Sequence, residues 1–151
     1  MKKNYQLTIS GIKELETELE GLLSRRGGAI RKIVEARDFG DLSENAEYDV
    51  AREEQGLIET RIAEIEDILQ NASVIKGGDK QKVSLGSVVE LKVGKKVVIY
   101  TIVGPVEADP LAGKISNESP IGLKIFGKKV GDKAIISAPK GDITYEIVKI
   151  A

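Results

Sequence analysis

The sequence predicts an α+β protein of two domains: an antiparallel α-helical coiled-coil hairpin over residues 1–76 and a small antiparallel sheet domain with a short helix over 81–151. Between positions 12 and 69 apolar residues recur with the spacing of an α-helix, whereas from Val89 onward they alternate with polar residues as in strands. The glycine-rich stretch from Lys76 to Lys80 separates the two patterns, so we place a linker at 77–80.

The first long helix is expected to begin after Leu7, where Thr8 or Ser10 can cap its first turn. Its apolar stripe consists of Ile12, Leu15, Leu19 and Leu22, followed by Ile30, Ile33, Val34 and Ala36. Gly27-Gly28 lies between the two halves, and each glycine costs about 1 kcal/mol in a helix interior. We therefore expect one long helix with a weak or bent middle, ending at Phe39-Gly40 because glycine commonly follows a helix C-terminus.

The second long helix has an apolar stripe with 4-3-4 spacing, which can zip against the first helix. The stripe consists of Ile58, Ile62, Ile65 and Leu69. Helices of about 30 residues extend about 45 Å at 1.5 Å per residue, a length that suits a probe reaching into another molecule.

The second domain is predicted from alternation and turn residues. Residues 89–93 and 97–103 read as two strands joined by a turn at Gly94, and 109–113 reads as a loop. Ser119 as cap and Pro120 at the first helical position indicate a short helix. A hairpin turn at 140–142 joins the last two strands.

Composition excludes several kinds of chemistry. The 151 residues include no cysteine and no histidine, which excludes disulfides, thiolate zinc sites and histidine general bases. A net charge of −1 gives no global attraction to nucleic acid or to an anionic membrane, so any such contact must be local. The chain has no apolar run long enough for a membrane span and no signal-peptide pattern, and we expect a cytoplasmic protein.

The bend between the two helices concentrates negative charge. It contains the string Asp41-Leu42-Ser43-Glu44-Asn45-Ala46-Glu47-Tyr48, and eight carboxylates lie between positions 35 and 54 against only Arg37 and Arg52. Like charges this close repel unless a cation neutralises them, and hard divalent cations such as Mg²⁺ prefer carboxylate oxygens.

Asp41 and Glu44 have two interpretations. Their spacing is that of a capping box, with Asp41 as N-cap and Glu44 three residues later, and spacing alone favours this interpretation. Alternatively, both are metal ligands. Since Mg²⁺ needs six oxygens, two carboxylates do not hold it tightly, so they would complete a metal site held mostly by another molecule.

The tip string, followed by Ala51-Arg52-Glu53-Glu54-Gln55-Gly56 and Arg61-Ile62, closely resembles the signature of the bacterial GreA/GreB transcript cleavage factors. The similarity continues through the stretch from Ile115 to Gly122 and from Lys140 to Lys149, and it covers nearly the whole chain. The GreA branch fits better because few basic residues flank the tip.

This resemblance implies a coiled-coil domain followed by a domain similar to the FKBP fold. The second domain would dock at the rim of the secondary channel of bacterial RNA polymerase, and the hairpin would enter the channel. Asp41 and Glu44 would help to hold a second, shared Mg²⁺ at the polymerase active site, where backtracked RNA is hydrolysed near its 3′ end. The factor would then be a cofactor of another enzyme, acting as a monomer, although the stripe leaves self-association open.

The resemblance also suggests roles for other residues. Arg37 and Arg52 match a basic patch that contacts RNA, although surface salt bridges to nearby carboxylates explain them equally well. Tyr48 would pack across the tip, and Asn45 would fix its backbone. Ser119, Pro120 and Ile121 match a polymerase-docking loop, and a helix start explains the first two equally well.

The sequence departs from the family pattern at two places, and two functions other than transcript cleavage are left open. Gly27-Gly28 stands where the family often has a proline-containing stretch, and Ser43 replaces a residue that is often basic in relatives. One rival is a channel-binding regulator that does not activate cleavage, although such relatives alter the acidic tip. The other is a peptidyl-prolyl isomerase, which needs an aromatic-lined cleft. For such a cleft the second domain offers only Tyr100, Phe126 and Tyr145.

Overall fold

The structure is a computed structural model that describes residues 3–38 and 45–151. It contains two compact units, one formed by residues 12–71 and the other by residues 3–11 together with 72–151. The boundary between the two units therefore falls after residue 71, ahead of the linker predicted at 77–80. The N-terminal strand belongs to the second unit.

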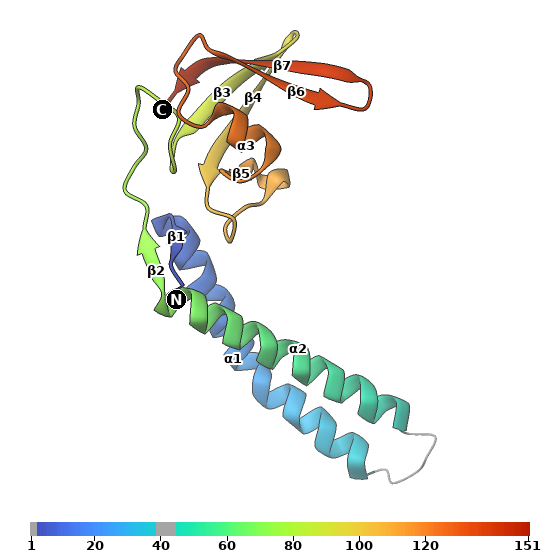
Figure 1. Ribbon diagram of the computed structural model, residues 1–151. Helices are drawn as coiled ribbons and strands as arrows, with labels where there is room; N and C mark the ends of the chain where they lie inside the picture. Colours follow the sequence, from blue (N-terminus) through green and yellow to red (C-terminus); the bar gives the residue numbers. More distant parts are fainter. Residues whose placement is uncertain (1–2, 39–44) are drawn as a thin grey trace. The chain divides into compact units, whose positions relative to one another are not determined.

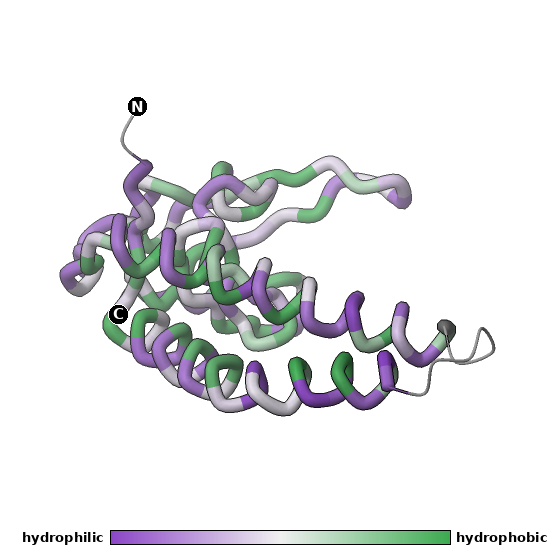
Figure 2. Tube along the Cα trace, turned by 90° about the horizontal axis from the view of Figure 1, so that it is seen from below, coloured by the Kyte–Doolittle hydropathy of each residue, from purple (hydrophilic) through white to green (hydrophobic). Residues whose placement is uncertain are grey.

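The helical unit is an antiparallel hairpin of α1 (Ile9–Asp38) and α2 (Asn45–Gln70), which run side by side (Figure 1). Its core lies between the helices, and apolar residues recur along both of them (Figure 2). The buried cluster consists of Leu22, Ala29, Ile58, Ile62 and Ile65, with Leu15, Leu19 and Leu69 packed against it. The stripe predicted for the second helix is thus confirmed. Of the first half of the α1 stripe, Leu15, Leu19 and Leu22 belong to this cluster, whereas Ile12 is half-buried and is not one of its members.

The second half of the α1 stripe was predicted wrongly at two positions. Ile30 and Val34 are 43% and 49% exposed, whereas Ala29, Ile33 and Ala36 are buried. Successive residues of a helix are turned by about 100°, so when Ala29 and Ile33 face α2, Ile30 and Val34 fall on the neighbouring face. The predicted weak or bent middle is not seen as a break, because α1 is continuous from Ile9 to Asp38.

Ion pairs join the two helices on their polar sides. Arg26 donates to both carboxylate oxygens of Glu59 at 2.8 and 2.9 Å, and Arg61 donates to both oxygens of Glu18 at the same distances. A third pair joins Lys32 to Glu54 at 3.4 Å. The hydrogen bond from Arg61 lowers the pKa of Glu18, and the same bond raises the pKa of Arg61. Bidentate pairs have a defined geometry, so they fix the register of the hairpin.

The second unit is built on a five-stranded sheet with strand order β5-β4-β3-β7-β6. In chain order the elements are β3 (Val88–Val93), β4 (Lys96–Val103), η2 (Pro110–Ala112), β5 (Lys114–Ser116), α3 (Pro120–Ile125), β6 (Lys133–Ala138) and β7 (Gly141–Ile150). The predicted turns at Gly94 and at 140–142 are confirmed, since both join antiparallel strands. The sheet as a whole was predicted to be antiparallel. That part is wrong, because β5 pairs parallel to β4 and the sheet is mixed.

The core of this unit lies between the sheet and α3. Its buried members are Val83, Val89, Leu91, Ile102, Ile115, Ile125, Ala134, Ile147 and Ile150. In β3 alternate residues, Val89 and Leu91, supply this face, as the period-two pattern predicts. In β7 the buried residues are Ile147 and Ile150, which do not alternate, and the β3–β7 register shifts between Glu90 and Leu91. The predicted loop at 109–113 contains the short 3₁₀ helix η2, which ends at Gly113 with φ of 77°.

The N-terminal residues 3–11 belong to the second unit and are bound to it by strand pairing and hydrogen bonds. Strand β1 (Tyr5–Leu7) pairs parallel with β2 (Ala72–Val74), a pairing that short-range patterns did not reveal. Glu107, whose side chain is only 4% exposed, accepts hydrogen bonds from the backbone N–H of Thr8 at 3.0 Å and from the Thr8 hydroxyl. Thr8 in turn accepts from the N–H of Gly11 at 3.0 Å, as predicted for a helix cap. Within residues 3–38 and 45–151, no helix is both long and apolar enough to cross a membrane.

Candidate nucleic-acid interface at the hairpin end

The residues predicted to be most important lie outside the described part of the chain. Asp41 and Glu44 fall between residues 38 and 45, so the choice between helix cap and metal ligand stays a prediction. Asn45 is the first residue of α2. Within residues 3–38 and 45–151, no group of three or more metal-ligating side chains is assembled. The described residues therefore provide no complete metal site of their own.

Beside this segment, Tyr48 and Arg52 contact each other on α2. They lie one turn apart and so share a face of the helix. The Nη1 of Arg52 donates to the hydroxyl of Tyr48 at 3.2 Å, and its Cζ lies 5.9 Å from the centre of the ring. This distance is within the range of a cation–π interaction. Tyr48 was expected to pack across the tip, and the partner that the structure shows for it is Arg52.

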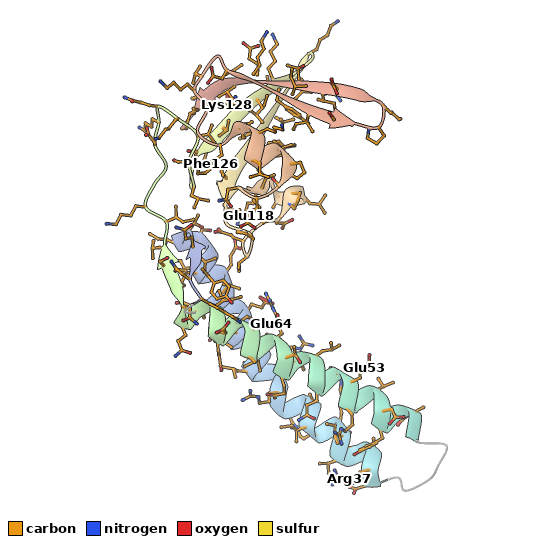
Figure 3. All side chains as sticks on the ribbon, viewed as in Figure 1. Arg37, Glu53, Glu64, Glu118, Phe126 and Lys128 are labelled. Carbon is orange, nitrogen blue, oxygen red and sulfur yellow. The ribbon has the colours of Figure 1, made fainter. Side chains whose placement is uncertain are left out.

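Arg37 approaches the same phenol from the other helix. It lies at the end of α1 (Figure 3), and its side chain, like that of Arg52, lowers the pKa of the Tyr48 hydroxyl. The hydrogen bond from Arg52, and then that from Arg37, lowers the pKa of Tyr48 from its ordinary value. The bond to Tyr48 also raises the pKa of Arg52. Neither arginine forms an ion pair with a carboxylate of residues 3–38 or 45–151, so the salt-bridge interpretation has no support there.

A groove of about 420 Å³ lies between the helices close to these residues. Its lining combines apolar side chains with charged side chains of both signs. The lining residues are Lys32, Glu35, Ala36, Ala46, Glu47, Val50, Ala51 and Glu54. With Lys32 and Glu54 already paired across the helices, this groove is explained by the small side chains Ala36, Ala46 and Ala51.

In the second unit, Ser119, Pro120 and Ile121 form the start of α3. Ser119 is the N-cap: its hydroxyl accepts from the N–H of Gly122 at 3.0 Å and donates to the carbonyl of Ser116 at 2.6 Å. Ile121 packs against the core, while Pro120 at the first helical position is exposed. The helix-start interpretation of Ser119 and Pro120 is confirmed. Of the three, Pro120 presents its side chain most openly to a partner.

Sequence reasoning missed two features. It placed Arg37 and Arg52 in one patch but did not identify Tyr48 as the partner of Arg52. The four-residue spacing of Tyr48 and Arg52, which places both on one face of a helix, was the available signal for this contact. Glu107 was also missed, since no local pattern indicates that a carboxylate is buried by pairing with Thr8.

Comparison with known proteins identifies the family. Residues 5–74 match the family model described as transcription elongation factor, N-terminal, and residues 78–151 match transcription elongation factor, GreA/GreB, C-terminal. The chain belongs to the GreA/GreB family of transcription elongation factors. The resemblance predicted from the tip string is thus confirmed, and this string lies within the N-terminal GreA/GreB match.

Individual GreA/GreB relatives agree over the full length. The chain is 49% identical to transcription elongation factor GreA of Mycoplasma genitalium, with 100% of this chain and 98% of that protein covered. It is 44% identical to GreA of Bacillus cytotoxicus, with 99% and 98% covered. Among solved structures, GreA factor homolog 1 of Thermus thermophilus is 32% identical over 99% of both chains, with a TM-score of 0.47. The predicted two-domain α+β fold is confirmed by the structure of this chain itself, which has a helical hairpin and a separate sheet unit.

Proposed function

We propose that this elongation factor enters the secondary channel of bacterial RNA polymerase and stimulates endonucleolytic cleavage of backtracked RNA by the polymerase. The observation that carries the proposal is the match of both halves of the chain to the two GreA/GreB family models, with the acidic string retained between the helices. The factor is not a nuclease by itself in this proposal, because the catalytic site belongs to polymerase. It acts in the cytoplasm with polymerase and the 3′ end of the nascent RNA as partners.

The hairpin is long enough to act as a probe. Its helices contain 30 and 26 residues, which correspond to about 45 and 39 Å at 1.5 Å per residue. A two-helix hairpin buries little apolar surface, so the bidentate pairs Arg26–Glu59 and Arg61–Glu18 are well placed to keep its helices in register. The tip would thereby be carried to a defined position at the far end of the helices.

At that end, Asp41 and Glu44 would supply carboxylate oxygens to a Mg²⁺ shared with polymerase. This donor set fits the ion's preference for hard oxygen ligands, and two carboxylates alone are too few to bind it tightly. When bound, such a second metal stabilises the attacking and leaving oxygens of a phosphoryl displacement. The carboxylates contribute the negative charge that retains the ion, and Asn45 would support the backbone beside them.

Arg37 and Arg52 would contact the extruded RNA. Both guanidiniums lie beside the tip segment and lack carboxylate partners within residues 3–38 and 45–151, which supports a role in binding phosphate. In the second unit, the exposed Pro120, with Ser119 and Ile121 holding the start of α3 in place, would contribute to docking at the channel rim.

The test is RNA cleavage in backtracked bacterial elongation complexes, with wild type, Asp41→Asn and Glu44→Gln compared across a Mg²⁺ titration. We expect wild type to shorten the transcript, and both variants to bind polymerase but to require much more Mg²⁺. Glu53→Gln is the matched control, because Glu53 is an exposed carboxylate on α2 (Figure 3) that should leave the Mg²⁺ dependence unchanged.

Other outcomes would change the conclusion. If wild type binds polymerase without cleavage, the protein is a channel-binding regulator that does not activate cleavage. If Asp41→Asn and Glu44→Gln cleave as well as wild type, these residues only cap a helix. A peptidyl-prolyl isomerase is not favoured, because Tyr100 and Tyr145 pack against the core while Phe126 is exposed.

A further inference from the structure

The second unit contains a polar pocket of about 400 Å³ beside strand β1. Three segments line it: residues 4–6 at β1, residues 104–106 after β4, and residues 117 and 118 between β5 and α3. All three segments belong to the second unit, so the pocket lies within one compact part of the chain. We call it the Asn117 pocket.

Close backbone contacts hold these segments in place. A Cβ atom on Gly104 would lie 2.8 Å from the carbonyl oxygen of Gln6, so the glycine lets the loop approach β1 closely. The N–H of Asn117 donates to the carbonyl of Val103 at 3.0 Å, and the N–H of Glu118 donates to a side-chain hydroxyl at 2.9 Å. The pocket is therefore built by the fold before any ligand arrives, as is usual for small-ligand sites.

One atom of the lining has an unmet hydrogen-bonding requirement. The Oδ1 of Asn117 is buried and accepts no hydrogen bond from residues 3–38 or 45–151. Buried polar atoms are normally paired, because removal from water without a partner costs free energy. Asn4, in the same lining, shows the usual situation, since its Oδ1 accepts from the hydroxyl of Ser73 at 2.8 Å. A ligand in the pocket can supply the donor that Asn117 lacks.

Glu118 gives the pocket its charge. It is the charged residue of the lining, and it is exposed at the connection between β5 and α3 (Figure 3). It forms no ion pair with any residue of the described ranges 3–38 and 45–151. An unpaired carboxylate and an unpaired amide oxygen both call for hydrogen-bond donors. A cation with several donors complements this lining, whereas an anion would be repelled by Glu118.

We propose that the Asn117 pocket binds a guanidinium group, which donates to Oδ1 of Asn117 and to the carboxylate of Glu118. A guanidinium carries five N–H donors in a planar fork, so it can serve two acceptors at once and can bond a carboxylate through two parallel N–H groups. An ammonium is a compact and strongly hydrated charge, which fits such a pair of acceptors less well. Pro105 and Val106 offer apolar surface to the aliphatic stem that carries the guanidinium.

The first experiment titrates the free, full-length protein with blocked amino acids and follows the NMR signal of the Asn117 side-chain amide in ¹⁵N-labelled protein. We expect N-acetyl-arginine amide to move this signal saturably. N-acetyl-citrulline amide has a similar shape without the charge, and its dissociation constant should be at least about ten-fold higher. N-acetyl-lysine amide, with an ammonium in place of the guanidinium, should also bind several-fold more weakly.

Two sources can present this group: an arginine side chain of a protein partner or a small guanidino compound. Agmatine, which has the guanidinium and stem without the peptide groups, distinguishes them. Binding equal to that of N-acetyl-arginine amide would support the proposal with a free guanidino compound as ligand. Binding that is several-fold weaker would support it with an arginine of a polypeptide, because the peptide groups then contribute.

Variants test the two acceptors separately. Glu118→Gln should raise the dissociation constant of N-acetyl-arginine amide about five-fold, because a charged acceptor becomes neutral. Asp142→Asn, which removes an exposed carboxylate of β7 outside the lining, should leave it unchanged. Asn117→Asp should instead lower the dissociation constant about ten-fold, since the buried oxygen becomes charged. Thr144→Asp adds the same charge at an exposed position of β7 and is the matched control.

Three results would overturn the proposal. They are equal binding of the citrulline and arginine compounds, a dissociation constant that does not fall in folded Asn117→Asp, and saturable movement of the Asn117 signal by sodium acetate. The last would mean that the amide presents its N–H groups and that the pocket takes a carboxylate. Thermal melts without ligand show which variants are folded. If Asn117→Asp does not fold, Glu118→Gln and its control still decide, because Glu118 is exposed.

This inference goes beyond the proposed function and does not depend on it. Binding is measured on the free protein, with no polymerase or RNA present. If no guanidinium compound binds, the inference is wrong and the cleavage proposal is unaffected. If Asp41→Asn and Glu44→Gln cleave as well as wild type, the cleavage proposal fails and the titration of the Asn117 pocket keeps its meaning.

Discussion

Replacing Gly27 and Gly28 by alanine should stabilise the helical hairpin. Both glycines lie inside α1, which is continuous over Ile9–Asp38, and neither has a positive φ. A Cβ atom built at either position meets no other atom within 4 Å, so the added methyl groups cause no clash. The two glycines therefore lower the stability of α1 through their low helix propensity, and no close contact requires glycine at either position.

The magnitude follows from helix propensity. Glycine is less favourable than alanine by about 0.8–1.0 kcal/mol in a helix interior, so Gly27→Ala/Gly28→Ala should add about 2 kcal/mol to the free energy of unfolding. For a unit of about 60 residues, each kcal/mol raises Tm by about 4–8 °C, which gives about 8–16 °C for the pair. Urea unfolding followed by the helical CD signal would measure the free energy, and a thermal melt would measure Tm.

A control in the same helix makes the result decisive. Gly21 also has open space around its Cβ position, and Gly21→Ala should stabilise by about 1 kcal/mol. If Gly21→Ala gives this gain while the Gly27/Gly28 variant is unchanged or less stable, then α1 is not a continuous helix at Gly27-Gly28 in solution. The weak middle suggested by the sequence would then be real.

Two further predictions concern stability. Glu18→Gln should cost about 0.5–1 kcal/mol at neutral pH, because the Glu18–Arg61 pair is about 40% exposed and such pairs contribute little. Since the hydrogen bond from Arg61 lowers the pKa of Glu18, this contribution is present above the ordinary pKa of a glutamate and is lost as the pH falls through the folded-state pKa; in urea unfolding, the difference between wild type and Glu18→Gln should shrink as the solution is made more acidic. Gly122→Ala should destabilise the second unit by roughly 2 kcal/mol or more, since its Cβ would lie 2.0 Å from the carbonyl oxygen of Ser116. Thermal unfolding would detect this change, with Gly77→Ala, where space is open, as the control that should show no such loss.

The helical half of the fold could be predicted well because its signal is local. The stripe of Ile58, Ile62 and Ile65 repeats at the helical period, and the structure buries all three against α1. The prediction failed at Ile30 and Val34, where two adjacent faces of α1 both carry apolar residues. Which face turns inward there is set by contact with α2, and a one-dimensional pattern does not contain that information.

In the second unit, hairpins were predicted and longer connections were not. Gly94 and the turn at 140–142 join strands that are neighbours in sequence, so local turn chemistry was enough. The parallel partners β4–β5 and β1–β2 are joined by longer paths through the chain, and their pairing depends on tertiary contacts. Ser119 was predicted as a helix cap from its neighbour Pro120, and the structure shows both of its hydrogen bonds.

By itself, the sequence determined the helical hairpin, the acidic string between its helices, the switch from helix to strand, and the family. These depend on residue order and spacing, which the chain carries before it folds. Only the tertiary structure decided that Arg52 donates to the hydroxyl of Tyr48, that Glu107 is buried against Thr8, and that Ile30 faces solvent. The side-chain geometry of Tyr48 and Arg52, the pairing of Thr8 with a residue 99 positions away, and the exposure of Ile30 exist only once the helices and strands have formed and packed.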